Sequence, residues 1–329
     1  MSTHPVFTRR RVAQAGLGLL AASALGAHAQ SPWPSKPVRI IVGFSAGGTT
    51  DVVARLMAKE LTDALGQTFI VDNRPGGGSN IATDLVRTAE PDGYTLLMMA
   101  VTSTINQTLY SNIKFDLGRD FKGVALSAKM PNILVVNPDV PAKTVAEFIQ
   151  WARAQGDKVS YASSGSGTSI HMAGELFKVR TGIQAVHVPY KGSAPALTDL
   201  MGGQVQYMFD NMISSWPHVQ AGKLRALAVT TPQRSPSAPD VPSMEESGVA
   251  PFDVTSWFGL VAPKGTPQDA IDKVNRVVNQ AFDKPEVKAA YARLGAIAEK
   301  NTPQEFDQFI ASEVRNWAPV VKASGARVD

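Results

Sequence analysis

Apolar positions along the chain are spaced so that strand-like runs alternate with helix-like stretches. Residues 38–42 predict a buried strand, and after a turn at 43–48 a helix places Val53, Met57, Leu61 and Leu65 on one face. Further strands are predicted at 68–72, 94–100, 124–127, 133–136, 159–162, 185–188, 205–209, 224–229 and 256–261, and a further helix at 80–89. This alternation predicts an α/β fold, with a mostly parallel sheet that carries helices on its faces.

Helix starts are marked by capping signals. Thr144 and Thr302 each stand three residues before a Glu, which predicts a capping box at two helix starts, and Pro303 occupies the first helical position of the second. The stretch that begins at Thr266 is a close relative of this pattern.

Two extended passages bounded by prolines, 127–138 and 254–263, divide the chain. If the chain crosses between domains at both, residues 129–256 form one domain, and residues 30–128 and 257–329 together form the other. Two crossings make a hinge over a cleft that can close around a ligand. The alternative is one continuous large sheet in which both passages are internal strands.

Residues 1–29 have the pattern of a cleaved export signal. Arg9, Arg10 and Arg11 precede an uncharged apolar stretch at 17–27 that is too short for a permanent anchor. The small residues Ala27 and Ala29 predict cleavage after Ala29. The general and the twin-arginine export routes both stay open, while the absence of a Cys after the cleavage site excludes a lipid-anchored lipoprotein.

Composition excludes several classes of protein. The 329 residues contain no Cys, so disulfides, thiolate metal sites and cysteine nucleophiles are ruled out. The net charge of +4 includes the three leader arginines, which leaves the mature chain near +1 without a basic tract. This balance argues against nucleic acid as a partner. After the leader, no apolar run is long enough for stable membrane insertion.

Two loops of small residues each lead from a predicted strand into a helix. Glycines let a ligand approach the backbone, and a helix start supplies free N–H groups with a partial positive charge, which suits a carboxylate or phosphate. The ligand-binding candidates are Phe44, Ser45, Ala46, Gly47 and Gly48 in the first loop, and Gly165, Ser166, Gly167, Thr168 and Ser169 in the second. Thr102 and Ser103, which follow the strand at 94–100, are further candidates, as are Tyr190 and Asp210 at two other strand ends. Asp210 is also interpreted as a residue that caps a helix or acts indirectly.

Catalysis and metal binding are not favoured by the sequence. Residues 43–47 do match the Gly-x-Ser-x-Gly nucleophile elbow, with Ser45 as the nucleophile. The only histidines after the leader, His171, His187 and His218, lie in the other predicted domain, and a triad split across a moving cleft is not expected. These three histidines show no metal-ligand spacing, so we expect no metal, no cofactor and no enzymatic activity.

The chain resembles the substrate-binding proteins of tripartite tricarboxylate transporters, the Bug or TctC-like receptors. The segments that carry the resemblance are 33–39, 44–51, 71–76, 91–96, 165–171, 187–192, 194–197, 222–227, 240–243 and 257–260. The match covers nearly the whole mature chain, and these segments stand in the order that the family has. Two positions depart from the commonest pattern: Ser45 stands where Ala is frequent, and Ala46 stands where Pro is frequent.

The resemblance implies a two-domain type II periplasmic-binding-protein fold that closes over one ligand in the interdomain cleft. It implies a monomeric receptor in the periplasm that delivers a di- or tricarboxylate, an acidic amino acid or an aromatic acid to a membrane transporter with one large and one small subunit. In the family, backbone groups of both Gly-rich loops hold ligand carboxylates, partly through ordered waters. The alternatives are a ligand-sensing partner of a membrane signalling protein and, third, a periplasmic serine hydrolase.

Overall fold

The computed structural model describes Met1, residues 33–326 and Val328. The predicted leader and its cleavage site therefore lie outside the described residues. Lys36–Asp329 forms one compact unit, and the fold described below is the fold of that unit. Among the described residues, no helix combines the length and the apolar character needed to cross a membrane.

Five strands form the first half-sheet. Their order is β2 (Phe69–Asn73), β1 (Val38–Val42), β3 (Thr95–Ala100), β9 (Thr255–Pro263) and the first part of β4 (Phe121–Val136). β1 is parallel to β2 and β3, whereas β9 is antiparallel to β3 and β4. Four predicted strands are thus confirmed, and their predicted ends differ from the observed ones by no more than two residues: 38–42, 68–72, 94–100 and 256–261.

The last part of β4 belongs to a second half-sheet. There it lies between β8 (Arg225–Val229) and β7 (Tyr207–Asn211), followed by β5 (Ser160–Ser163) and β6 (Val186–Pro189). β4 is antiparallel to β7 and β8, while β5 is parallel to β6 and β7. The mostly parallel sheet expected from the sequence is therefore wrong for the strands around β4 and β9, which both pair antiparallel.

β4 is one strand of 16 residues where the sequence predicted two. Pro131 pairs in register with Thr255 of β9, and the next residue, Asn132, pairs with Asn211 of β7. A proline lacks the N–H that a ladder needs, so it is tolerated where the strand exchanges one partner for another. The two half-sheets therefore share an unbroken strand, and the domain boundaries at 128/129 and 256/257 stay a prediction.

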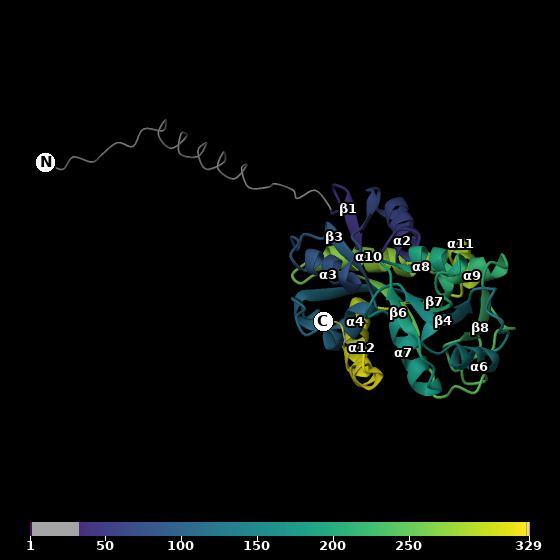
Figure 1. The fold of residues 1–329 in the computed structure, drawn as a ribbon. Helices are drawn as coiled ribbons and strands as arrows, with labels where there is room; N and C mark the ends of the chain where they lie inside the picture. Colours follow the sequence, from purple (N-terminus) through teal and green to yellow (C-terminus); the bar gives the residue numbers. More distant parts are fainter. Residues whose placement is uncertain (2–32, 327, 329) are drawn as a thin grey trace. The chain divides into compact units, whose positions relative to one another are not determined.

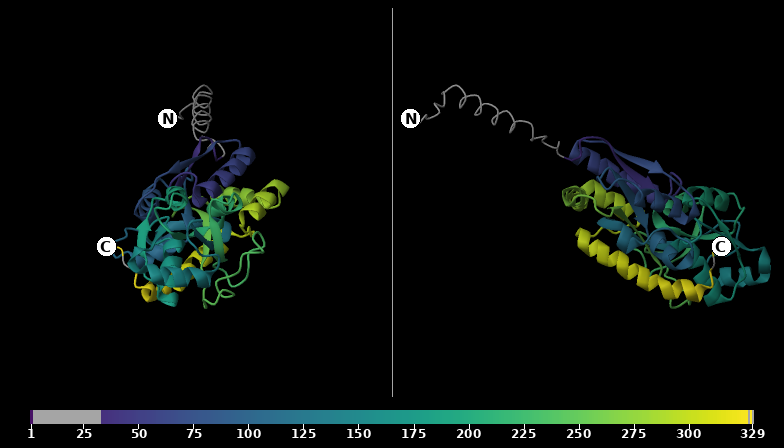
Figure 2. Two further views of the ribbon diagram at one scale, coloured as in Figure 1. Left: turned by 45° about the vertical axis from the view of Figure 1, so that its right-hand side comes forward. Right: turned by 90° about the vertical axis from the view of Figure 1, so that its left-hand side faces the viewer.

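Helices cover both half-sheets (Figures 1 and 2). They are α2 (Thr49–Leu65), α3 (Asn80–Arg87), α4 (Thr102–Leu109), α5 (Leu117–Asp120), α6 (Val145–Gln155), α7 (Ser169–Thr181), α8 (Ser193–Met201), α9 (Met212–Gln220), α10 (Gln268–Ala281), α11 (Pro285–Leu294) and α12 (Pro303–Ser324), with 3-10 turns η2 (Gly77–Ser79) and η3 (Gly156–Lys158). The long α12, yellow in both figures, packs on α4, β4 and α7, so it touches helices that flank both half-sheets.

The predicted capping box is confirmed at α12, where Thr302 and Glu305 form the full reciprocal pair. At α6 only half of the box forms: Thr144 accepts from the N–H of Glu147, but the carboxylate of Glu147 accepts from the N–H of Lys143. At α10 the expectation is wrong, because the hydroxyl of Thr266 donates to the carbonyl of Pro263 and Pro267 is the N-cap residue.

Candidate functional site

The N-termini of five helices meet at one small cavity. We call it the inner cavity; it is lined by Phe44, Gly48, Thr49, Thr50, Ala100, Val101, Thr102, Ser164, Thr168, Ser169, Ser193, Asn211, Ser256 and Phe258. These residues include the first or the capping residues of α2, α4, α7, α8 and α9. Each helix start presents free N–H groups and a partial positive charge, so the five together favour an anion.

The inner cavity encloses about 20 Å³, which is room for about one water molecule. A second space of about 190 Å³, here called the outer pocket, shares Phe44 and Ser164 with it. The outer pocket is lined by Gly43, Phe44, Gly76, Gly77, Gly78, Ser79, Tyr110, Ser164, Gly165, Ser166, Pro189, Tyr190 and Lys191. The two spaces are therefore neighbours, separated or joined at Phe44 and Ser164.

The first Gly-rich loop is held in shape by Asp51 and Asn73. The carboxylate of Asp51 accepts from the N–H of Gly47 over 2.9 Å and from Arg55, and the amide of Asn73 bridges Asp51 to the carbonyl of Phe44. Burial opposes ionisation of Asp51, but these hydrogen bonds outweigh it and lower its pKa. Gly47 has φ of +80°, a conformation that favours glycine. The N–H of Gly47 is thus occupied by Asp51, and Phe44 and Gly48 are the loop residues on the cavity wall.

The second Gly-rich loop is held by Thr168 and His171. Thr168 is the N-cap of α7: its hydroxyl accepts from the N–H of His171 and donates to the carbonyl of Gly165 over 2.7 Å. The N–H of Gly167 in turn donates to Nδ1 of His171.

A buried histidine, His171, and a half-buried one, His187, support this second loop from behind. The rings of His171 and His187 stack with 4.0 Å between centroids, and Nε2 of His187 lies 2.6 Å from the hydroxyl of Ser163, the last residue of β5. Burial, with help from the neighbouring Lys178, lowers the pKa of His171 to about 4; burial and the adjacent His171 lower that of His187 to about 3. Both rings are therefore neutral at physiological pH, so Nδ1 of His171 can accept the Gly167 N–H.

Three contacts join the two Gly-rich halves of the site. The N–H of Ser45 donates to the carbonyl of Lys191 over 2.9 Å, and the hydroxyl of Thr49 donates to that of Ser214 on α9 over 2.9 Å. The Cα of Gly78 packs so closely against the loop at Ser166 that an added Cβ would lie 2.3 Å from its carbonyl oxygen. The helix starts that flank the first and the second half-sheets are therefore in direct contact around the cavity.

A hydroxyl and amide network closes the floor of the cavity at the shared strands. The hydroxyl of Ser256 on β9 lies 2.6 Å from that of Ser169, accepts from the amide of Asn211, and donates to Oδ1 of Asn132. All four side chains are buried. The point where β4 exchanges partners is therefore tied directly to the start of α7.

Charged side chains are absent from the described lining of the inner cavity. Of the described residues that line it, none is Lys, Arg, His, Asp or Glu, and in the outer pocket Lys191 is the one cation. Hydroxyls, one amide and backbone groups make up its polar surface. A carboxylate there would be stabilised by helix termini and charge-assisted hydrogen bonds rather than by an ion pair.

The predicted site residues occupy different layers of this arrangement. Phe44, Gly48, Thr102, Thr168 and Ser169 line the inner cavity, and Gly165, Ser166 and Tyr190 line the outer pocket. Ser45, Ala46, Gly47, Ser103 and Gly167 belong to the same loops and helix starts without lining either space. Asp210 is fully buried behind the wall, where its carboxylate accepts from Ser193 over 2.6 Å and from Ser214.

Several lining residues were not among the sequence candidates. Ser193 and Asn211 begin α8 and α9 without a Gly-rich signature, and Ser256 lies in an ordinary apolar strand. The sequence could have indicated these residues only by their positions. Ser193 and Asn211 stand where a strand or its loop leads into a helix, and Ser256 lies in the extended passage at 254–263.

The geometry does not support the nucleophile elbow. In the described part of the chain, the hydroxyl of Ser45 is buried and has no hydrogen-bond partner. The serine that does meet a histidine is Ser163, which is itself fully buried. A hydrolytic serine needs both an adjacent base and access to substrate, and neither serine has both.

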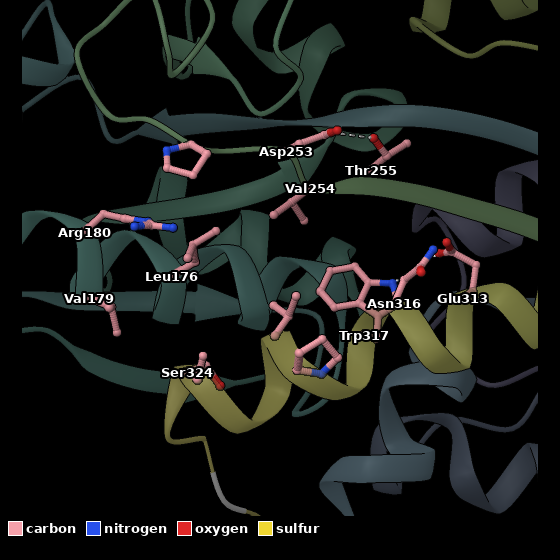
Figure 3. Close-up of a pocket in the computed structure, with 14 residues that line it drawn as sticks. Leu176, Val179, Arg180, Asp253, Val254, Thr255, Glu313, Asn316, Trp317 and Ser324 are labelled. Carbon is pink, nitrogen blue, oxygen red and sulfur yellow. Dashed lines mark hydrogen bonds between the residues drawn. The ribbon is translucent and has the colours of Figure 1, made fainter.

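A larger groove of about 750 Å³ lies between α7 and α12 (Figure 3). Leu176 and Val179 of α7 line it together with Trp317 of α12, all in the C-terminal halves of their helices. Helix C-termini carry a partial negative charge, so this groove offers an anion no helix N-terminus, and Arg180 is the one cation among its described lining residues. Its Glu313 already accepts from the indoles of Trp257 and Trp317.

Comparison with solved structures places this arrangement in the class of two-domain periplasmic solute-binding receptors. The periplasmic binding protein BugD is 34% identical, covering 90% of this chain and 99% of its own, with a TM-score of 0.87. A Rhodopseudomonas palustris protein solved with adipate is 36% identical, with coverage of 90% and 100% and a TM-score of 0.87. MatC from Rhodopseudomonas palustris, solved with bound malate, is 33% identical, with coverage of 88% and 100% and a TM-score of 0.84.

Residues 53–326 match the model of the TctC family, which is described as the tripartite tricarboxylate transporter family receptor. The chain belongs to this family, as its sequence motifs predicted. Its relatives are solute-binding receptors rather than enzymes.

Proposed function

We propose that this chain captures a small dicarboxylate, with one carboxylate in the inner cavity and the other in the outer pocket. The observation that carries the proposal is the meeting of five helix N-termini at a cavity whose lining, in the part of the chain that the structure describes, has no charged side chain. Such a site stabilises one compact anion by backbone donors and hydroxyls.

The ligand class follows from the two spaces and from the relatives. One end of the ligand enters the inner cavity, whose walls must separate slightly because about 20 Å³ holds a water molecule but not a carboxylate. The outer pocket of about 190 Å³ receives the rest of the ligand. Lys191 lies on the wall of the outer pocket, where a second carboxylate gains a screened attraction. Two relatives were solved with adipate and with malate, which are both dicarboxylates.

Closure is the second part of the proposal. The contacts of Ser45 with Lys191 and of Thr49 with Ser214 form only when the two sides of the site approach each other. A ligand that bridges both Gly-rich loops favours this closed arrangement by its differential affinity. Domains 30–128 with 257–329, and 129–256, would then move about the shared strands β4 and β9 as a monomeric periplasmic receptor that delivers its ligand to a two-subunit membrane transporter.

A thermal-shift and calorimetry panel tests the proposal. The panel contains malate, adipate, succinate and citrate, with aspartate and benzoate as the other acid classes and the diamide of succinate as a neutral control. A dicarboxylate present at a hundredfold its Kd adds about 2.7 kcal/mol of stability, whereas the diamide has no effect. Stabilisation by a neutral solute, with none by any carboxylate, would overturn the proposal.

A further inference from the structure

Asp210 is a buried acid that contacts the hydroxyl of Ser193, and Ser193 lines the inner cavity. It is 0% exposed; its Oδ1 accepts from the hydroxyl of Ser193 over 2.6 Å, and its Oδ2 accepts from the hydroxyl of Ser214. Burial raises the pKa of Asp210 to about 6, although both hydroxyls and the N–H of Asn211 act in the opposite direction. The acid therefore changes its protonation state close to neutral pH.

No cation balances this acid in the described part of the chain. Alternation along β7 puts Tyr207 and Phe209 in one core cluster and Met208 in the other, and Asp210 shares the face of Met208. The elements that pack on β7 carry the following ionisable groups: Lys122 and Lys129 on β4, Tyr161 on β5, His171, Glu175, Lys178 and Arg180 on α7, Asp199 on α8 and His218 on α9. Tyr207 lies on β7 itself, Lys191 precedes α8, and the first turns of α2, which packs on α9, carry Asp51 and Arg55. Asp51 is paired with Arg55, and Asp199 accepts from Tyr190. Only hydroxyls and backbone groups bond to Asp210.

The protonation state of Asp210 decides where the single hydroxyl proton of Ser193 can be donated. The hydroxyl of Ser193 has one proton, and while Asp210 is ionised that proton is donated to its carboxylate. Ser193 lines the inner cavity, so it then offers only lone pairs to a bound anion. Once Asp210 is protonated, its own O–H can donate to Ser193, and the serine proton is free to donate to the ligand.

We propose that binding of an anion in the inner cavity is coupled to the uptake of one solvent proton by Asp210, which turns Ser193 into a donor to the ligand. The inference rests on the proposed carboxylate-binding function. Asp210 is thus a positioning residue that acts through Ser193. Two reasons act together: a second negative charge disfavours the ionised acid, and the protonated acid supplies a hydrogen bond that the ionised acid withholds.

The sign of the pH dependence follows from this exchange. Below the pKa of Asp210 in the free receptor, the proton is already present and affinity does not change with pH. Above it, every binding event must take up a proton, so the Kd rises by up to about tenfold per pH unit. The dependence ends above the pKa that Asp210 has in the complex, where binding no longer takes up a proton.

Calorimetry with adipate and malate at pH 6, 7 and 8, in buffers of different ionisation enthalpy, tests the proposal. We expect uptake of between about half and one proton per ligand at pH 7 to 8, and a Kd that rises with pH. Asp210→Asn keeps a donor toward Ser193, so it should match the wild type at pH 6, bind more tightly than the wild type at pH 8, and take up no proton. Asp63→Asn, the same change at an exposed acid of α2, should behave as the wild type.

The outcomes separate this inference from the proposed function. Binding without proton uptake, or equal pH slopes in wild type and Asp210→Asn, would overturn the role of Asp210 and leave the receptor function intact. Failure of every carboxylate in the panel to bind would overturn both. If Asp210→Asn did not fold, the proton uptake of the wild type would still decide the matter.

Discussion

The hydroxyl of Thr49 donates to the hydroxyl of Ser214 over 2.9 Å, and Ser214 in turn donates to Asp210. This chain joins the first turn of α2, beside the first half-sheet, to α9 and β7 of the second. All three residues are buried. The bond joins the two sides of the cavity, so under the proposed closure it forms only in the closed state.

Thr49→Val should weaken ligand binding by roughly fivefold, because it keeps the side-chain shape and removes one buried hydrogen bond worth about 1 kcal/mol. Isothermal calorimetry with the bound dicarboxylate measures the change. Thr88→Val serves as the control, since Thr88 is exposed and bonds only to its own helix. Equal affinities in the two variants would mean that the Thr49 contact does not contribute to the closed state.

Gly167→Ala should abolish measurable binding while the protein stays folded. Gly167 has φ of +82°, and an added Cβ would lie 2.0 Å from Oδ1 of Asn106 on α4. Gly182→Ala is a matched control, because Gly182 ends the same helix with φ of +70° and no atom lies within 4 Å of its added Cβ. Gly47→Ala should be milder than Gly167→Ala, since its Cβ meets only the side chain of Ala194 at 3.7 Å. Normal affinity in Gly167→Ala would contradict the close contact of the loops.

Lys191→Ala should weaken binding by no more than about threefold, because an exposed cation is largely screened by water. Thr168→Val should weaken it more, since it removes the cap of α7 and the bond to Gly165, and a lost cap alone costs about 1 kcal/mol. Titration of both variants with the same dicarboxylate compares them. The reverse order of effects would indicate a direct ion pair with Lys191.

The stacked histidines should make the protein less stable in acid. Because burial lowers the pKa of His171 to about 4 and that of His187 to about 3, the unfolded chain binds protons below about pH 6.5 that the folded chain refuses. Stability from this source is complete above pH 6.5 and declines as the pH falls toward 4. Urea unfolding of the wild type and of His187→Phe, at several pH values, measures the slope.

The phenylalanine variant should have the smaller loss between pH 6.5 and 4, since its ring cannot titrate. Asp210 is present in both proteins, so its opposite contribution cancels in the comparison: its raised pKa favours the folded state below about 6. Parallel pH curves would show that the histidines do not titrate in this range.

Ligand binding should reduce the radius of gyration measured by small-angle X-ray scattering. The expected cause is rotation about the shared strands β4 and β9, with formation of the Ser45–Lys191 and Thr49–Ser214 contacts. In Thr49→Val the decrease at saturating ligand should be unchanged while more ligand is needed to reach it. A radius of gyration that stays at the value of the ligand-free receptor at every ligand concentration would contradict closure.

The features that sequence alone predicted are the local ones. The strand, glycine turn and helix at 38–65 and at 160–181 are encoded by neighbouring residues, so both loops of the site could be found without a structure. Ser193, Asn211 and Ser256 could not, because their chemistry depends on which helix and strand ends meet in space. Ser256 reaches the cavity only because β9 pairs with β4 in the register that sets Thr255 opposite Pro131.

The direction of the strands was predicted less well, because it too depends on contacts between segments that are distant in the sequence. Alternating strands and helices do predict parallel pairs within each half-sheet, and β1, β2 and β3 follow that rule. The direction of β4 and β9 is decided by packing between segments more than a hundred residues apart. Pro131, which lies between the strands predicted at 124–127 and 133–136, marks the place where β4 exchanges one partner for another.

The absence of charged side chains from the wall of the inner cavity bears on how a receptor of this kind diverges. A backbone N–H is supplied by every residue type except proline, so most substitutions at these helix starts leave the donors in place. Under the proposed binding mode, the donors that hold the anion are then retained with the fold, while Tyr190 and Lys191 of the outer pocket act through their side chains and change the site when they are substituted. Duplicated copies of such a gene can therefore acquire new acids as ligands through a few substitutions in the outer pocket, without rebuilding the part of the site that holds the charge.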